Sequence, residues 1–226
     1  KQHGLRTVYV TNGYESQECL EYLRPVLDAV NIDLKSFNDE WYQRICGARL
    51  EPVCRTIAEC VRMGIHTEVT TLVIPGENDS DEELRKAAEF LASINPNIPW
   101  HLSAYHDAYN FHGRGRTPVE TLQRAASIGK AAGLRFIYLG NCNAPEARVT
   151  FCPECQKPLI ARGFSTARID FKKGHCSCGT LIPGVFKDAE NILAPISHSD
   201  QQSTKAVVYA TGSGTAEQIA QSIASR

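Results

Sequence analysis

The chain has 226 residues, of which 42% are hydrophobic and 22% are charged. That is enough for one large domain or two smaller ones, and it excludes a chain that is disordered throughout. The formal net charge of -1 gives no basic surface of the kind that binds nucleic acid. No apolar run reaches the roughly 18 residues of a membrane span. We therefore expect no nucleic-acid partner and no membrane association.

The beginning of the sequence is typical of a fragment. It starts at Lys1 without a secretory signal, and Gly4 resembles the residue that follows the end of a helix. We therefore expect the amino-terminal part of the parent protein to lie upstream of Lys1. The missing signal and the nine cysteines favour a reducing compartment such as the cytoplasm.

Strands and helices are predicted to alternate through the first 140 residues. A β-rich run ends at Asn12, Pro25 must bend or interrupt the first helix, and Ser80 with Glu83 forms a capping box. The predicted strands are residues 7–11, 30–35, 67–74, 100–106 and 135–139, and the predicted helices are residues 16–29, 38–46, 52–63, 80–93 and 118–132. This alternation predicts an α/β fold of parallel βαβ units, either a TIM-like barrel or an open doubly wound sheet.

Polar residues gather where these strands end, as they do in barrel enzymes. Asp33 and Lys35 are two residues apart, so they lie on one face of their strand, and a zwitterionic ligand would satisfy both. The alternatives are a structural ion pair or a solvated strand end. Thr11 and Asn12 could equally form a plain turn, and His106 could be a structural histidine.

Several motifs resemble those of known enzymes. V-T-N-G, N-I-D-L-K, E-V-T-T-L-V-I-P-G-E-N-D and S-A-Y-H follow the order of the later barrel strands of pyruvate formate-lyase-activating enzymes. I-C-G-A-R-L-E-P-V, P-W-H-L-S and G-L-R-F-I-Y-L-G-N resemble the AmmeMemoRadiSam system radical SAM enzymes over roughly residues 1–186. The resemblance implies the later strands of a partial (β/α)6 TIM-like radical SAM barrel. It also implies S-adenosylmethionine (SAM) and a [4Fe-4S] cluster as cofactors, and a radical that abstracts hydrogen from a protein or small-molecule substrate.

The resemblance also implies roles for single residues. The SAM-binding residues would be Thr11, Asn12, Asp33, Lys35, Leu72 and His106. Activating enzymes often carry Arg where this chain has Thr70, so an Arg–SAM contact is not expected. The C-x3-C-x2-C motif of the cluster is absent from the sequence. Its ligands are therefore expected upstream, and the chain by itself is expected to be inactive.

Four of the nine cysteines have the spacing of metal ligands. Cys152 and Cys155 form one close pair, and Cys176 and Cys178 form another about twenty residues later. Two such pairs can converge on Zn²⁺ in a closed, structural site like a zinc ribbon, with His175 as a substitute ligand. Two disulfides or free thiols are the alternatives. Cys19, Cys46, Cys54 and Cys60 lie in predicted helices and are expected to be small, buried hydrophobic residues.

The last twenty residues read as one strand, a loop and one helix. The loop residues Thr211, Gly212, Ser213, Gly214, Thr215 and Ala216 resemble the FMN phosphate loop of a flavodoxin-like domain. A fused flavodoxin would supply electrons to the cluster. The expected organisation is a barrel part at residues 1–150, a zinc-ribbon-like segment at 151–186, a linker at 187–205 and an incomplete flavodoxin-like start at 206–226.

Two other functions fit parts of the pattern. Lys35 could be a Schiff-base nucleophile of another barrel enzyme, with Asp33 as its partner. Alternatively, residues 150–186 could dock a protein partner as a zinc-ribbon binding module, with an inert barrel half. Borohydride trapping on Lys35 would favour the first alternative, and a pull-down with residues 150–186 would favour the second.

Overall fold

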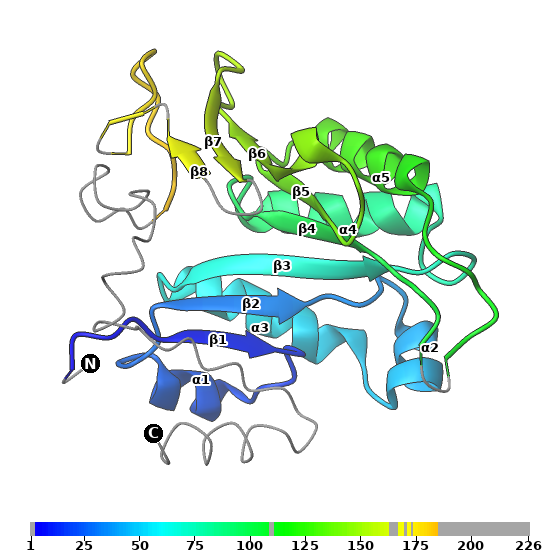
Figure 1. The fold of residues 1–226 in the computed structure, drawn as a ribbon. Helices are drawn as coiled ribbons and strands as arrows, with labels where there is room; N and C mark the ends of the chain where they lie inside the picture. The colour runs from blue at the N-terminus through cyan, green and yellow to red at the C-terminus, as the bar shows by residue number, and fades with distance from the viewer. Residues whose placement is uncertain (1–2, 109–110, 163–166, 170, 173, 185–226) are drawn as a thin grey trace, which may run out of the picture. The chain divides into compact units, whose positions relative to one another are not determined.

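A computed structural model describes residues 3–108, 111–162, 167–169, 171–172 and 174–184 (Figure 1). The described residues divide into two compact units, one up to Thr70 and one from Thr71 onward. The predicted linker at 187–205 and the predicted FMN phosphate loop at 211–216 lie outside the described residues. Among the described residues, no helix has both the length and the apolar character needed to cross a membrane.

The first unit is built from parallel strands joined by helices. Its elements are β1 (Val8–Thr11), α1 (Gln17–Leu23), β2 (Ala29–Asp33), α2 (Asp39–Trp41), the π-helix η1 (Tyr42–Cys46), α3 (Leu50–Arg62) and the larger part of β3 (His66–Val73). β1 pairs with β2 in parallel, with Thr11 opposite Ile32. β2 pairs with β3 in parallel, with Asp33 opposite Thr70. The predicted βαβ connectivity is thus confirmed here.

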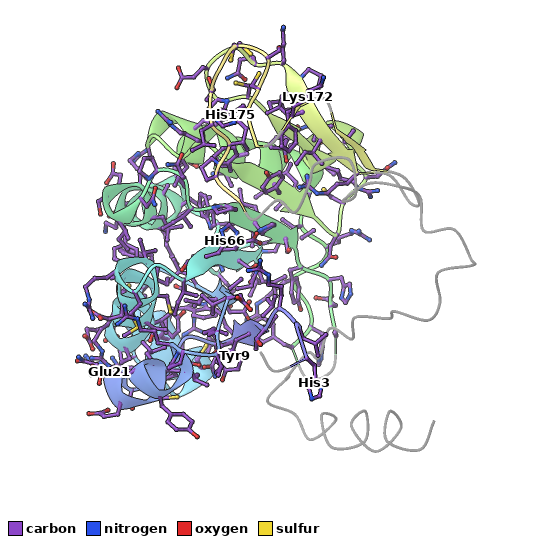
Figure 2. The ribbon with its side chains drawn as sticks, turned by 90° about the vertical axis from the view of Figure 1, so that its left-hand side faces the viewer. His3, Tyr9, Glu21, His66, Lys172 and His175 are labelled. Carbon is purple, nitrogen blue, oxygen red and sulfur yellow. The ribbon has the colours of Figure 1, made fainter. Side chains whose placement is uncertain are left out.

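The two faces of these strands differ in polarity. On one face Val30, Ile32 and Val69 are almost fully buried, and Figure 2 shows the helices of this unit on one side of its strands. The other face carries half-buried polar side chains such as Asn31 and Glu68. Because side chains alternate along a strand, this period of two gives the unit one apolar and one polar sheet face.

The second unit repeats the alternation and adds a small sheet. Its elements are the end of β3, then α4 (Asp81–Ile94), β4 (Trp100–Ala104), α5 (Val119–Ala131), β5 (Ile137–Gly140), the 3-10 helix η2 (Pro145–Arg148), β6 (Val149–Phe151), β7 (Pro158–Arg162) and β8 (Ala167–Ile169). β4 and β5 are parallel, with Trp100 opposite Ile137. Gly129 of α5 lets this helix approach closely, because a Cβ there would stand 2.7 Å from Ile137 Cδ1 and 3.0 Å from the Trp100 ring.

The strands among the described residues form two sheets, one of five strands in the order β1-β2-β3-β4-β5 and one of three in the order β6-β7-β8. β6, β7 and β8 pair antiparallel. Every strand and helix predicted between residues 7 and 139 is found, with ends shifted by a few residues. The largest shift is in α1, which ends at Leu23 because Pro25 cannot continue a helix. The zinc-ribbon class of the small sheet stays a prediction.

Candidate functional site

The turn after β1 is held by its own side chains. Asn12 is exposed, and its Oδ1 accepts the Tyr14 backbone N–H at 3.1 Å. The Thr11 hydroxyl accepts the Gly13 N–H at 3.1 Å and donates to a carboxylate oxygen of Glu15. Thr11 and Asn12 therefore already have partners within the turn, and their predicted contact with SAM stays a prediction.

Thr11 and the pair Asp33–Lys35 lie on opposite faces of the sheet. Thr11 stands opposite Ile32 in the parallel register, and paired residues of adjacent strands point to the same face. Ile32 is fully buried on the apolar face, whereas Asp33 and Lys35 follow the polar face. The sequence predicted that Asp33 and Lys35 share a face, and their contact confirms it.

Asp33 and Lys35 form a partly exposed ion pair at the end of β2. Lys35 Nζ lies 2.8 Å from Asp33 Oδ2, and the two side chains are 39% and 35% exposed. Ion pairs this accessible contribute about 0–1 kcal/mol to folding. The pair is therefore not needed to hold the unit together, and its two charges remain accessible to a charged ligand.

The backbone around this pair is fixed by neighbouring elements. The Lys35 N–H donates to the Tyr42 hydroxyl oxygen of η1 at 2.9 Å, and the Leu34 N–H donates to the Thr70 carbonyl of β3 at 2.9 Å. Tyr42 is buried, and its burial raises the pKa of the phenol well above the ordinary value. The hydroxyl therefore stays protonated over the physiological pH range. The π-helix thus positions Lys35 through its backbone.

Thr70 faces the same polar surface. Its hydroxyl donates to Asn31 Oδ1 on β2 at 2.8 Å. The position at which activating enzymes often carry Arg is therefore occupied here by a short side chain engaged with the neighbouring strand. Any anion bound near the end of β2 must be neutralised by Lys35 or by groups outside this strand pair.

Leu72 and His106, the other two predicted SAM residues, belong to the second unit. Leu72 is half-buried on β3, and its carbonyl accepts Asn78 Nδ2 at 2.8 Å. His106 follows β4 and is exposed. The described contacts therefore bring Asp33 and Lys35 together, and the gathering of all six residues around one SAM molecule stays a prediction.

Asn78 is a buried residue that the sequence reasoning did not single out. It is 2% exposed, and its Oδ1 accepts the Ile74 N–H at 2.7 Å. Together with the bond to Leu72, this amide closes the P-G-E-N turn after β3. The signal that could have found it is an Asn shortly after a strand-ending Pro-Gly, a usual place for side-chain-to-backbone turn bonds.

The segment after β4 is a second feature that the sequence reasoning missed. The buried Tyr105 donates to Asp107 Oδ1 at 3.0 Å, and its ring meets Phe111 edge to face. Arg114 pairs with the Glu77 carboxylate and lies 4.0 Å above the Phe111 ring. These contacts hold residues 105–108 and 111–117 against the turn that follows β3, within the second unit. In barrel enzymes such segments at carboxyl strand ends contact substrate.

The four-cysteine group, Cys152, Cys155, Cys176 and Cys178, converges as the spacing predicted. All four Sγ atoms lie within 4.8 Å of one another. None of these cysteines is in a disulfide. Hydrogen bonds from the Thr180 side chain and backbone lower the pKa of Cys178 to about 6. Thiolates are the form in which cysteine binds metals.

The remaining predicted cysteines and His175 are not among the converging ligand residues. Cys60 is buried, Cys54 is half-buried, and Cys19 and Cys46 are exposed, so the expected burial is confirmed for Cys60 alone. His175 is exposed and forms a backbone turn with Lys172; Figure 2 labels both residues. Within the described residues, the atoms that converge as metal ligands are the four sulfurs.

Comparisons with known proteins agree with the motifs. Residues 1–91 match the family model of the Radical SAM superfamily. The chain is 36% identical over 187 residues to an uncharacterized protein of Methanocaldococcus jannaschii, covering 80% of this chain and 55% of that protein. It is 23% identical over 151 residues to the pyruvate formate-lyase 1-activating enzyme of Escherichia coli, covering 61% of each. The chain thus spans little more than half the length of these relatives.

The fold has a solved counterpart. A domain of pyruvate-formate lyase-activating enzyme from Bacteroides vulgatus superposes with a TM-score of 0.52 at 24% identity, covering 62% of this chain and 84% of that domain. At this identity the likeness shows the α/β fold of parallel strands. The matched family model spans β1, β2, α3 and β3, and so includes the ion pair of Asp33 and Lys35. Residues 1–91 are therefore similar to the radical SAM superfamily, and the chain is similar to the pyruvate formate-lyase-activating enzymes.

Proposed function

We propose that this chain supplies SAM-binding strand ends to a radical SAM enzyme related to the pyruvate formate-lyase-activating enzymes. The observation that carries the proposal is the accessible ion pair of Asp33 and Lys35, at the end of a strand inside the superfamily match. When bound, SAM and the reduced [4Fe-4S] cluster together supply a 5′-deoxyadenosyl radical, which takes a hydrogen atom from a substrate. The chemistry belongs to the cofactors, and the protein positions them.

The residues at the end of β2 fit a SAM molecule. SAM carries a carboxylate, an ammonium and a sulfonium charge. Lys35 can donate to the carboxylate, while Asp33 can accept from the ammonium or from a ribose hydroxyl. Both side chains are about one third exposed, so a ligand can reach them without displacing core residues. Because the backbone of Lys35 is already fixed, less conformational entropy is lost when a ligand binds.

The residues present do not fit the [4Fe-4S] cluster. No C-x3-C-x2-C motif occurs in the 226 residues. The sulfurs of the four-cysteine group lie within 4.8 Å of one another, which suits one ion better than four iron atoms with one thiolate each. We therefore propose that the cluster thiolates come from a part of the protein outside residues 1–226, and that this chain provides the surface on which SAM lies.

A binding measurement tests the proposal. SAM is titrated calorimetrically into the complete protein with its cluster reconstituted, and then into Lys35→Met and Asp33→Asn. Hydrogen bonds to charged groups contribute about 1.5–3 kcal/mol, so each variant should bind SAM about 10- to 100-fold more weakly.

A matched ion pair provides the control. Lys86 and Glu82 form an exposed i,i+4 pair on α4, at 2.6 Å. Lys86→Met removes the same charge and the same kind of contact from a surface helix, and SAM affinity should not change. Equal SAM affinity in wild type, Lys35→Met and Lys86→Met would rule out the proposed role of the strand end.

The Schiff-base alternative for Lys35 predicts a different result. Schiff-base lysines are usually desolvated in an apolar pocket or activated by a nearby cation. Lys35 is instead 39% exposed and paired with a carboxylate. Borohydride treatment in the presence of a carbonyl compound should therefore leave Lys35 unmodified, as mass spectrometry of the peptide would report. A reduced adduct on Lys35 would favour the alternative.

A further inference from the structure

The first cysteine pair forms a metal-binding knuckle. After Cys152 and Cys155 the chain turns through Gln156, a residue other than glycine in the left-handed region with φ of 58°. The Gln156 N–H donates to the Cys152 carbonyl at 3.0 Å, and the Cys152 N–H donates to the Lys157 carbonyl at 2.9 Å. Left-handed residues other than glycine need support from their surroundings. The turn is therefore a well-defined local structure that directs both sulfurs to the same side.

The second pair forms a similar turn despite its shorter spacing. Gly179 follows Cys178 and is also left-handed, with φ of 93°. The Gly179 N–H donates to the Cys176 carbonyl at 2.9 Å, and the Cys176 N–H donates to the Thr180 carbonyl at 2.9 Å. The Thr180 hydroxyl lies 3.1 Å from Cys178 Sγ. The one-residue-shorter C-x-C spacing thus still presents both sulfurs from one tight turn.

Two S–S distances between the knuckles are close to those of a tetrahedral site, and all four sulfurs lie within 4.8 Å of one another. Cys152 Sγ lies 3.6 Å from Cys178 Sγ, and Cys155 Sγ lies 3.5 Å from Cys176 Sγ. These distances are far longer than the roughly 2.05 Å of a disulfide bond. A single Zn²⁺ with Zn–S bonds of about 2.3 Å requires sulfurs about 3.8 Å apart. Each of these two contacts joins a sulfur of the first knuckle to a sulfur of the second. Coordination of one ion by both knuckles requires this arrangement.

The group closes a small hydrophobic core. Cys152 is fully buried, Cys176 is 3% exposed, and Cys155 and Cys178 are exposed. The core consists of Phe136, Cys152, Leu159, Phe171, Cys176 and Ile182, with Tyr138 and Ile160 packed against it. Phe136 precedes β5 and Leu159 lies on β7, so this core fastens the small sheet to the parallel strands of the second unit (Figure 1).

We propose that the four-cysteine group binds one Zn²⁺ ion, and that this ion holds the small sheet of β6, β7 and β8 on the strand that begins after Phe136. Four thiolates favour Zn²⁺ or iron–sulfur centres over harder metals. The compact spacing favours a single ion over a cluster. All four positions are protein ligands, so the site is closed, and its role is structural. The site shares no residue with the proposed SAM-binding set.

The experiment measures metal content in the 226-residue chain. The chain is produced with both zinc and iron supplied, and its metals are counted by mass spectrometry. The expected result is about one zinc per chain, with four sulfurs at about 2.3 Å in zinc-edge X-ray absorption. The double variant Cys155→Ser/Cys178→Ser should lose this zinc. Both cysteines are exposed, so the change leaves the apolar core side chains in place.

Cys19 and Cys46 provide the matched control, because they are also exposed and free. Cys19→Ser/Cys46→Ser should retain one zinc per chain. If the first double variant unfolds, the absorption spectrum of the metal-free wild-type chain after addition of Co²⁺ provides an independent test. We expect the absorption bands of tetrahedral Co²⁺ bound by thiolates. Stoichiometric iron or sulfide, two disulfides in the mass spectrum, or zinc retained in a folded Cys155→Ser/Cys178→Ser chain would overturn the proposal. None of these results depends on SAM binding.

Discussion

Among the described glycines of the first unit, Gly13 has the least room for a side chain. It lies in the left-handed region with φ of 78°, directly after Asn12 in the turn that ends β1. A Cβ atom at this position would stand 2.7 Å from Ile32 Cγ2 and 2.9 Å from Val53 Cγ1. Both neighbours are buried and branched, so neither can move aside freely. The glycine is therefore required for the close approach of the turn to β2 and α3.

Gly13→Ala should destabilise the chain strongly. The left-handed conformation costs about 1–2 kcal/mol for a residue other than glycine, and overpacking adds about 1–3 kcal/mol. Gly64→Ala is the matched control, because Gly64 has φ of 75° but no atom within 4 Å of the added Cβ. Urea unfolding of both variants should give a clearly larger loss for Gly13→Ala. Equal losses would mean that the turn can shift away from Ile32.

The sequence could predict part of the residue-scale site. A spacing of two on a strand puts Asp33 and Lys35 on one face, and the 2.8 Å contact confirms it. The same reasoning did not reveal that Thr11 lies on the other face. That fact depends on the register of β1 against β2, and one strand pattern does not contain the register of its neighbour.

At the scale of elements, Asp39 joins α2 to α3. Arg49 is the residue before α3, and its side chain makes no capping bond. Asp39 Oδ1 instead accepts the Leu50 N–H at 2.9 Å and the Arg49 Nε–H at 3.1 Å. The Leu50 hydrogen bond, followed by the Arg49 side chain, lowers the pKa of Asp39. A carboxylate eleven residues away thus caps the helix that would otherwise begin uncapped.

This cap predicts a pH dependence. Because the pKa of Asp39 is lower in the folded chain, its contribution is present above its ordinary value of 3.8 and is lost as pH falls through the folded value. Asp39→Asn should therefore unfold at lower urea than wild type at pH 7. The difference should persist to about pH 5 and shrink below 3.8. A difference that stayed constant down to pH 2 would contradict the role of the charged form.

The elements themselves were largely predictable, because their ends carry local signals. Ser80 caps α4 by accepting the Glu83 N–H, as its capping box predicted. The π-helix η1 was not predictable, because residues 38–46 carry an ordinary helical pattern. Its form depends on tertiary contacts, among them the Tyr42 hydroxyl that accepts the Lys35 N–H. π-helical turns often occur at functional sites, and η1 contacts Lys35, one of the proposed SAM residues.

At the scale of the whole molecule, contacts between residues far apart in the sequence could not be predicted. Arg114 and Glu77 are 37 residues apart, and nothing in the local pattern pairs them. The cysteines are the exception, because knuckle spacing is a local signal that carries a long-range consequence. Two other expectations stay predictions: the domain boundaries at residues 150 and 186, and the flavodoxin-type electron donor. The comparisons do not test them, since the chain covers little more than half of the relatives' length.

The central claim is that this chain forms part of an enzyme that cleaves SAM. The most direct test is the yield of 5′-deoxyadenosine from SAM by the complete protein, reconstituted with iron and sulfide without oxygen and then reduced. We predict at least one equivalent of 5′-deoxyadenosine per cluster, with a lower yield in Lys35→Met at limiting SAM and an unchanged yield in Lys86→Met. A reduced, cluster-loaded protein that forms no 5′-deoxyadenosine would contradict the account.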